Sequence, residues 1–275
     1  MGFPDADDLR AATFIRHVEI HDTLTSTNNR AAELARDAHI DLPTLVVARL
    51  QTAGRGRGQN IWWSADGALT FSVLLEPAAL GIGAANWPQL SLAAAVAICD
   101  ALSNELSPHD NPQSEIRNPK SPLRLGIKWP NDVMLDGRKV CGILIESPGG
   151  AAPAKDRLIV GIGINVNNTW RDAPRDAEGD GAALCDVTGH QHDLQSILIA
   201  VLTAFAVRVG QVQTGDSALP RAWQQLNMLH DKIVRVETNG CSIEGRCVTI
   251  ESDGTLVVET GVGAQRLLSG SVRTP

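Results

Sequence analysis

The spacing of apolar residues changes type near residue 230, and this change limits what the chain can fold into. From 231 to 275 the sequence has no helical period and contains only short alternating runs such as IVRVE and TLVVET, separated by turn residues at Asn239-Gly240 and Asp253-Gly254. Short strands at this spacing are typical of a small β-barrel. A chain of 275 residues can hold one large and one small domain. We therefore predict two domains, residues 1–229 and residues 230–275.

Before this boundary, segments with strand and helix periods alternate, which predicts a mixed α/β (α+β) domain. Strands are predicted at 13–21, 44–50, 68–76, 123–129, 132–135, 139–147 and 157–166. Helices are predicted after the N-cap candidates Ser26 and Thr27, from Pro88 onward, over 193–212 and near 218–228. Asp136-Gly137 is a favoured hairpin turn between two of the strands. Two polar stretches, 107–122 and 168–186, predict loops, and the acidic, glycine-rich second one is expected to be mobile.

Composition excludes several classes of protein. The formal net charge of −7 argues against a general nucleic-acid binder, which usually has a basic surface. No run approaches the roughly 18 uninterrupted apolar residues of a membrane span, and the acidic N-terminus lacks the order of a signal peptide. The five cysteines are scattered and contain no CxxC pair. They therefore predict neither disulfides nor a zinc site, and we expect a reduced, cytoplasmic protein.

The segment QTAGRGRGQNIWWS at 51–64 places Arg55 and Arg57 between glycines and ends in Trp62 and Trp63. A phosphate loop of the GxxxxGK[ST] kind is excluded because no Gly-Lys-Ser/Thr follows. One short copy in an acidic chain does not favour an RNA-binding RGG segment. Two interpretations stay open. The segment is either a surface loop anchored by core tryptophans, or a flap whose arginines bind an anion while the tryptophans exclude water.

Two further segments contain candidate site residues. In KWPNDVMLDGRKVCGILIE, Lys128 and Lys139 flank a strand that begins at Asp132, and together they could meet a phosphate with Asp132 as counter-ion or metal contact. Exposed Lys–Asp pairs across a hairpin are the structural alternative. The run GIGINV at 161–166 lies in a strand and lacks the third glycine of a dinucleotide fingerprint. Its glycines instead allow a ligand to approach the strand, with Asn165 offering its amide.

Taken together, these segments resemble biotin protein ligases, also called biotin–[acetyl-CoA-carboxylase] ligases, from about Phe14 to the C-terminus. Five blocks occur in the order of that family: STN at 26–28, QTAGRGRGQNIW at 51–62, KWPNDVML at 128–135, GRKVCGILIE at 137–146 and GIGIN at 161–165. The resemblance implies a class II synthetase-like catalytic domain followed by an SH3-like barrel. It also implies a reaction in two steps. Biotin and ATP, with Mg²⁺, form biotinyl-5′-adenylate, and a lysine of a biotin carboxyl carrier protein then takes the biotin.

The resemblance also implies roles for individual residues. Contacts to biotin or its adenylate are expected from Ser26, Thr27, Asn28, Gln51, Gly54, Arg55, Gly56, Arg57, Trp62, Lys139, Gly142, Gly161 and Gly163. Catalytic roles are expected for Arg57, Lys139, Lys128 and Asp132, with Asp132 as the metal contact. Asn131 and Asn165 are expected on the ATP and adenine side. The adenine-covering segment should lie within 168–186, where we match no aromatic residue to the family.

Some alternatives stay open at this stage. A lipoate-type protein ligase on the same fold and a biotin-binding regulator without ligase activity are the competing functions. Only about a dozen residues precede the first predicted strand, too few for the DNA-binding domain of the repressor type, so we expect no operator binding and no membrane partner. The family includes monomers and dimers joined at a sheet edge, and the sequence does not choose between them.

Overall fold

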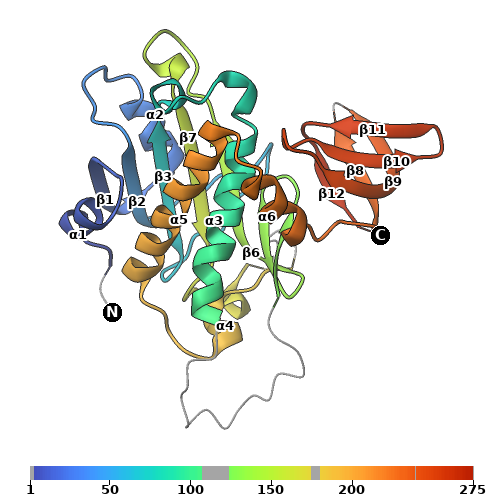
Figure 1. Cartoon of the computed structure of the whole chain (residues 1–275). Helices are drawn as coiled ribbons and strands as arrows, with labels where there is room; N and C mark the ends of the chain where they lie inside the picture. The colour runs from blue at the N-terminus through green and yellow to red at the C-terminus, as the bar shows by residue number, and fades with distance from the viewer. Residues whose placement is uncertain (1–2, 107–123, 175–179, 239, 275) are drawn as a thin grey trace.

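The computed structural model describes residues 3–106, 124–174, 180–238 and 240–274. A seven-stranded sheet forms the larger body and a five-stranded sheet follows it near the C-terminus (Figure 1). The expected loop at 107–122 lies outside the described residues. The mixed α/β class predicted from the sequence is confirmed.

The larger sheet has the strand order β1-β2-β3-β7-β6-β5-β4, in which β1 and β2 are parallel and every other neighbouring pair is antiparallel. Its strands are β1 (His17–Leu24), β2 (Thr44–Gln51), β3 (Leu69–Leu75), β4 (Leu125–Lys128), β5 (Asp132–Leu135), β6 (Arg138–Glu146) and β7 (Leu158–Ile164). All seven predicted strands are present. In the centre of the sheet, β3 and β7 are buried along their whole length, which explains why both are mainly apolar, with Thr70 and Ser72 as the buried polar residues of β3.

The sequence interpretation missed one helix, and it therefore placed the start of the first strand too early in the sequence. Helix α1 (Ala6–Ala12) begins after Asp5, whose carboxylate accepts hydrogen bonds from the backbone N–H groups of Asp7 and Asp8. The Thr13 hydroxyl donates to the Leu9 carbonyl at 2.6 Å, so this residue still belongs to the end of the helix. The prediction that the first strand starts at residue 13 is therefore wrong, and β1 starts at His17.

Four of the other helices, α2 (Thr27–Leu34), α3 (Gln89–Leu106), α5 (Leu194–Thr214) and α6 (Ala218–Leu226), lie close to their predicted positions. Helix α4 (Leu184–Thr188) was not predicted and begins within the segment that was predicted as a loop. In Figure 1, α3 and α5 run side by side across one face of the sheet, and α2 packs on β2, β3 and β7 through a separate apolar cluster. By length and composition, α5 could cross a membrane, with a mean hydropathy of 1.6. Its buried side chains, including Leu198, Leu202 and Phe205, belong to the core cluster that α3 shares, and this packing accounts for the apolar sequence.

The C-terminal sheet is antiparallel and has the order β11-β10-β9-β8-β12. Its strands are β8 (Ile233–Thr238), β9 (Cys241–Ile250), β10 (Leu256–Thr260), β11 (Gly263–Leu267) and β12 (Ser271–Arg273). The short strands were predicted, but no pairing among the described residues joins β11 to β12 and closes the sheet. The sheet contacts the larger body through the Trp129 indole, which donates to the Gly254 carbonyl at 2.9 Å. The domain division at residue 229 stays a prediction.

Residues 168–174 and 180–186 are more ordered than their sequence indicates, and the part of the predicted loop at 175–179 lies outside the described residues. The Asp186 carboxylate binds the Thr169 hydroxyl at 2.5 Å and the Trp170 backbone N–H at 2.8 Å. A short 3-10 helix, Trp170–Asp172, and helix α4 lie on either side of the gap. The expectation of a loop throughout is wrong at both ends. Hydrogen bonds between positions distant in the sequence order these residues. Such bonds leave no periodic pattern of apolar residues from which local structure could be predicted.

Candidate active site

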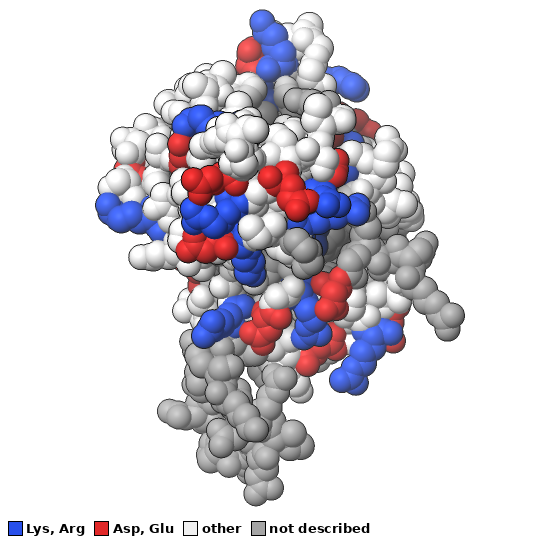
Figure 2. All heavy atoms as spheres, turned by 90° about the vertical axis from the view of Figure 1, so that its right-hand side faces the viewer, with Lys and Arg blue, Asp and Glu red and all other residues white. Residues whose placement is uncertain are grey.

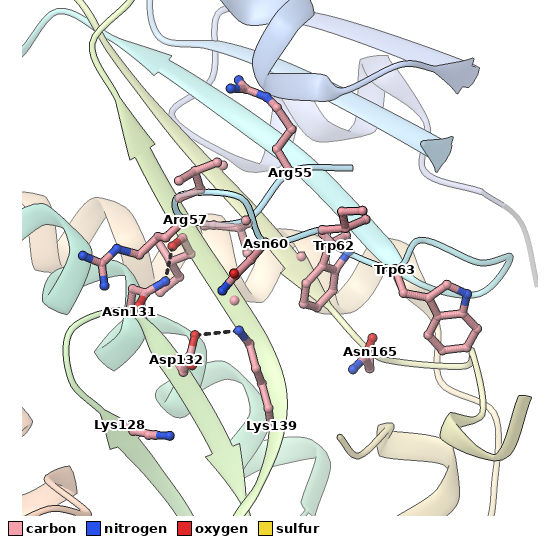
Figure 3. Close-up of a pocket in the computed structure, with 18 of the residues that line it drawn as sticks. Arg55, Arg57, Asn60, Trp62, Trp63, Lys128, Asn131, Asp132, Lys139 and Asn165 are labelled. Carbon is pink, nitrogen blue, oxygen red and sulfur yellow. Dashed lines mark hydrogen bonds and ion pairs between the residues drawn. The ribbon is translucent and has the colours of Figure 1, made fainter. Parts of the chain in front are cut away.

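A cavity of about 580 Å³ opens where β6 and β7, the start of α2, the Gly/Arg loop (residues 51–64) and β12 meet (Figure 3). Nearly all of the predicted site residues line this cavity: Ser26, Thr27, Asn28, Gln51, Arg55, Gly56, Arg57, Trp62, Lys128, Asn131, Asp132, Lys139, Gly142, Gly161, Gly163 and Asn165. Gly54 does not line it. A side chain at Gly54 would put its Cβ 2.5 Å from the Trp62 carbonyl oxygen, so this glycine shapes the loop instead.

The start of α2 forms the buried end of the cavity. Ser26 occupies the N-cap position, but its side chain makes no capping hydrogen bond. The Gln51 Oε1 atom instead accepts from the Thr27 backbone N–H at 2.8 Å and lies 3.2 Å from the Thr27 hydroxyl. Asn28 packs directly on β7, where a Cβ at Gly161 would approach Asn28 Oδ1 to 2.1 Å. The three polar residues Ser26, Thr27 and Asn28 are therefore buried beside the cavity, where they could bind a polar group of a ligand.

The Gly/Arg loop folds back so that the Trp62 indole lies on the sheet. The Trp62 backbone N–H donates to the Gly54 carbonyl at 3.0 Å, which closes the loop at its base. A Cβ at Gly163 would lie 2.4 Å from Trp62 Cε2, and one at Gly142 would lie 3.3 Å from Trp62 Cζ3. The Trp62 Nε1 atom is buried and has no hydrogen-bond partner among the described residues. The two strand glycines thus provide the flat surface that a large planar group needs.

Three cations and one carboxylate occupy the opposite side of the cavity (Figure 3). Lys139 Nζ lies 2.8 Å from Asp132 Oδ1, and both side chains are partly exposed. Lys128, at the end of β4, lines the same wall. Burial lowers the pKa of the Arg57 guanidinium, and the nearby Asp132 charge opposes this shift. Arg55 differs from these, because Figure 3 shows its guanidinium turned away from the cavity, where it forms two hydrogen bonds with Glu146.

The C-terminal sheet completes the cavity, which the sequence interpretation did not foresee. Arg57 Nη1 donates to the carbonyl of Gly270 at 2.8 Å, so the Gly/Arg loop is bound to the residue before β12. Ser271, Val272 and Arg273 then line the cavity and add a further cation. Nothing in the local sequence of β12 distinguishes it from the other short strands. Only the return of the chain to the larger body brings it to the site.

A second aromatic surface was also missed. Trp63 and Trp170 meet edge to face, with ring centroids 5.5 Å apart and an interplanar angle of 80°, and both line the cavity. Trp170 lies in the segment 168–186, where the sequence interpretation matched no aromatic residue, and an adenine contact in that segment stays a prediction. The nearby Asn165 side chain accepts from Asn168 at 2.9 Å, while its Nδ2 is buried without a partner among the described residues. Asn131 donates to the Ile143 carbonyl at 2.8 Å, which joins β5 to β6.

The metal prediction can be compared with the side chains present. Among the described residues, no group of three or more His, Cys, Asp or Glu side chains could hold a metal ion by itself. Mg²⁺ in nucleotide sites is usually held by one or two carboxylates together with substrate phosphates and water. Asp132 therefore fits an ion that arrives with a nucleotide, and it does not by itself make a metal site.

Comparison with known proteins gives consistent matches along the chain. The profile of the Biotin/lipoate A/B protein ligase family matches residues 21–165, and that of the Biotin protein ligase C terminal domain matches residues 229–272. The chain is 32% identical over 253 residues to a biotin--[acetyl-CoA-carboxylase] ligase of Paracoccus denitrificans, covering 90% of the chain and 96% of that protein. It is 30% identical over 266 residues to the bifunctional ligase/repressor BirA of Bacillus subtilis, covering 96% of the chain and 76% of that protein. The solved structure of an Aquifex aeolicus biotin protein ligase with biotin and ATP has a TM-score of 0.77 at 27% identity, covering 95% of the chain and 100% of that structure.

Proposed function

This chain belongs to the biotin/lipoate A/B protein ligase family, and we propose that the cavity beneath its Gly/Arg loop is where biotin and ATP react. The enzyme is an ATP-dependent ligase that attaches biotin to protein through biotinyl-5′-adenylate. The observation that supports the location is a cavity of about 580 Å³ that has buried amides and hydroxyls at one end and cations at the other. Biotin likewise has a polar ureido ring at one end and a carboxylate at the other.

The first step needs positive charge because both reactants are anions. Two like charges about 4 Å apart repel by roughly 4 kcal/mol at an effective dielectric constant near 20. Lys139, Lys128 and Arg57 line the cavity where the carboxylate and the α-phosphate would meet. Removing one hydrogen-bond donor that is positioned in advance at a developing charge costs about 2.7–4 kcal/mol of transition-state stabilisation in enzymes. In this proposal Lys139 leaves Asp132 to contact the biotin carboxylate, while Lys128 and Arg57 contact the phosphates.

Mg²⁺, when bound with ATP, would neutralise phosphate charge, and Asp132 is the residue proposed to hold it. The chain itself supplies the remaining requirements. Trp62 covers the strand glycines and would exclude water from the adenylate. The edge-to-face pair of Trp63 and Trp170 is proposed to contact the adenine, with Asn165 Nδ2 as a donor to one of its ring nitrogens. The acceptor lysine then attacks the acyl carbon, and AMP leaves.

We propose a biotin carboxyl carrier domain as the acceptor and the cytoplasm as the location. The acceptor follows from the relatives named biotin--[acetyl-CoA-carboxylase] ligase. The location rests on cysteine usage, because Cys99, Cys141 and Cys247 are buried and free.

Transfer is tested by incubating the chain with a carrier domain, ATP and biotin, followed by a streptavidin blot. We expect a labelled carrier that disappears when ATP is omitted. Two further assays, ATP–pyrophosphate exchange and biotin binding, separate the alternatives. A lipoate-type ligase would give ATP–pyrophosphate exchange with lipoate and not with biotin, and a regulator without ligase activity would bind biotin without labelling the carrier. The C-terminal domain match to biotin protein ligases favours biotin over lipoate.

A further inference from the structure

Glu146, the last residue of β6, joins the Gly/Arg loop to the polar end of the cavity. Its carboxylate accepts two hydrogen bonds from Arg55, at 2.9 Å to Oε1 and 2.6 Å to Oε2. It accepts a third at 2.7 Å from the Asn28 side-chain amide. The Glu146 side chain is 29% exposed and does not line the cavity, whereas Asn28 is buried beside it. One carboxylate therefore holds both a loop residue and a residue of the predicted biotin site.

The carboxylate also determines which way the Asn28 amide points. A carboxylate can only accept hydrogen bonds, so Asn28 must present its NH₂ group to Glu146. The other end of the amide, Oδ1, then faces the Ser72 hydroxyl at 2.6 Å. Ser72 is fully buried on β3, and its oxygen also lies 2.7 Å from the Thr27 hydroxyl oxygen. The orientation that Glu146 gives to the Asn28 amide thus affects the Thr27 hydroxyl through the buried side chains of Asn28 and Ser72.

The number of protons in this chain fixes the direction of each hydrogen bond. Ser72 has one hydroxyl proton, and because Asn28 Oδ1 cannot donate, that proton goes to Asn28. The Thr27 hydroxyl must then donate its own proton to Ser72. The proton then serves the 2.7 Å contact with Ser72 and not the longer 3.2 Å contact with Gln51 Oε1, which accepts from the Thr27 backbone N–H at 2.8 Å. Thr27 also lines the cavity, and its hydroxyl has no proton left for a ligand there. Thr27 is therefore an acceptor toward a ligand.

We propose that Glu146 is a positioning residue with two effects: it holds the Gly/Arg loop through Arg55, and it makes Thr27 an acceptor for a ureido N–H of biotin. This inference rests on the proposed function of the cavity. A ureido ring has two N–H donors and one carbonyl acceptor, so a buried hydroxyl whose proton is already used matches a donor on the ligand. Glu146 itself touches neither reactant. Its effect reaches biotin through Asn28 and Ser72.

The test begins with Glu146→Gln, which keeps the size of the side chain and removes the charge. The new amide has a single oxygen, whereas Asn28 and Arg55 together use both carboxylate oxygens. If that oxygen takes the Oε2 place, the NH₂ group faces the second Arg55 N–H, and if it takes the Oε1 place, the NH₂ group faces the Asn28 amide. We expect the Kd for biotin, measured by calorimetry, to rise about 10- to 100-fold, because hydrogen bonds to charged groups are the strong ones. The Kd for ATP should change less than about twofold. Glu244→Gln is the matched control, since Glu244 also pairs with an arginine, Arg235 at 2.7 Å, on the C-terminal sheet.

A reciprocal substitution separates positioning from a general loss of structure. Asn28→Asp alone places two carboxylates against each other and should weaken biotin binding more than Glu146→Gln does. In the double substitution Asn28→Asp with Glu146→Gln, the new glutamine NH₂ group can donate to one oxygen of the new aspartate. The other aspartate oxygen can still accept the hydrogen bond from Ser72. It should bind biotin more tightly than Asn28→Asp alone, even if Glu146→Gln by itself folds poorly. A double variant no better than Asn28→Asp, or a Glu146→Gln protein with unchanged biotin affinity, overturns the proposal.

A measurement without ligand tests the loop separately from the function of the cavity. Arg55 and Arg57 are trypsin sites within the Gly/Arg loop. Glu146→Gln should increase the rate of cleavage there about tenfold, in line with the loss of a charge-assisted pair, while Glu244→Gln leaves it unchanged. Equal cleavage rates in Glu146→Gln and the unsubstituted chain overturn the loop effect. If the unsubstituted chain binds no biotin but Glu146→Gln still loosens the loop, the proposed function fails and the role in positioning Arg55 remains.

Discussion

The substitution Gly163→Ala adds one methyl group to β7, and it tests whether the position of the Trp62 indole requires a residue without a side chain beneath it. The Cβ of an alanine there would lie 2.4 Å from Cε2, 2.6 Å from Cζ2 and 2.7 Å from Nε1 of the Trp62 indole. Carbon atoms in contact settle at about 3.5–4.0 Å, so the indole must move by about 1 Å or more. The added methyl group would occupy the space that the indole now fills over β7. The indole must therefore be displaced from the strand.

The magnitude of this effect follows from two opposing terms. Overpacking of this kind costs about 1–3 kcal/mol. Replacing glycine by alanine recovers about 0.4–1 kcal/mol by restricting the unfolded chain. Gly163→Ala should therefore lower the free energy of unfolding by about 1–2 kcal/mol. Gly210→Ala is the control, because Gly210 lies within α5 with open space around its Cβ, and it should stabilise the chain by about 0.5–1 kcal/mol.

The assay is urea unfolding of four proteins that form a double-mutant cycle: the unsubstituted chain, Gly163→Ala, Trp62→Ala and the double variant. Without the indole, Gly163→Ala should cost nothing, which gives a coupling energy of about 1–3 kcal/mol. Biotin binding should weaken in Gly163→Ala, because the displaced indole no longer covers the cavity. An equal cost of Gly163→Ala with and without the Trp62 indole would refute the contact as the cause.

Three further predictions concern single side chains. Lys139→Met should slow biotin-dependent ATP–pyrophosphate exchange about 10²–10³-fold with little change in melting temperature, and unchanged exchange would remove Lys139 from the first step. Arg57→Ala breaks the 2.8 Å hydrogen bond to Gly270, so biotinyl-adenylate should escape without carrier, measured by filtration of the loaded enzyme. The hydrogen bonds from Arg30 lower the pKa of Glu19 to about 2 from 4.5, so its stabilisation is present above pH 4.5 and is lost as the pH falls toward 2. Glu19→Gln should therefore flatten the acid limb of the stability curve by at most about 3 kcal/mol, and an unaltered limb would contradict this assignment.

Much of the fold could be predicted because the signals are local. The runs at 44–50 and 68–76 became β2 and β3, because apolar β-branched residues in a row belong to buried strands. Asp136-Gly137 formed the turn between β5 and β6, and both residues have positive φ, at 48° and 81°. Helix α1 could also have been found, since Asp5 before an alanine- and leucine-containing run is an N-cap signal.

The site was predicted in part for a different reason. Lys139 and Asp132 come together because the hairpin brings β5 and β6 side by side, and Lys128 lies opposite Asp132 in the pairing of β4 with β5. The short loop between β5 and β6 makes that pairing predictable. The sequence did not reveal that Arg55 would be paired with Glu146, because 91 residues separate them. It also did not reveal that Gln51 would take over the capping of α2, since the Ser26 side chain is the local candidate.

The sequence by itself therefore determined the seven strands of the larger sheet and most of the helices, the glycines on which flat groups can lie, and the charges available to bind two anions. Only the tertiary structure decided which of those charges remain directed to the cavity. Arg57 meets the carbonyl of Gly270, and Trp170 meets Trp63, because the chain returns twice to the same place from distant positions. Periodicity and turn chemistry act over a few residues, whereas pairing across the fold depends on where whole sheets pack.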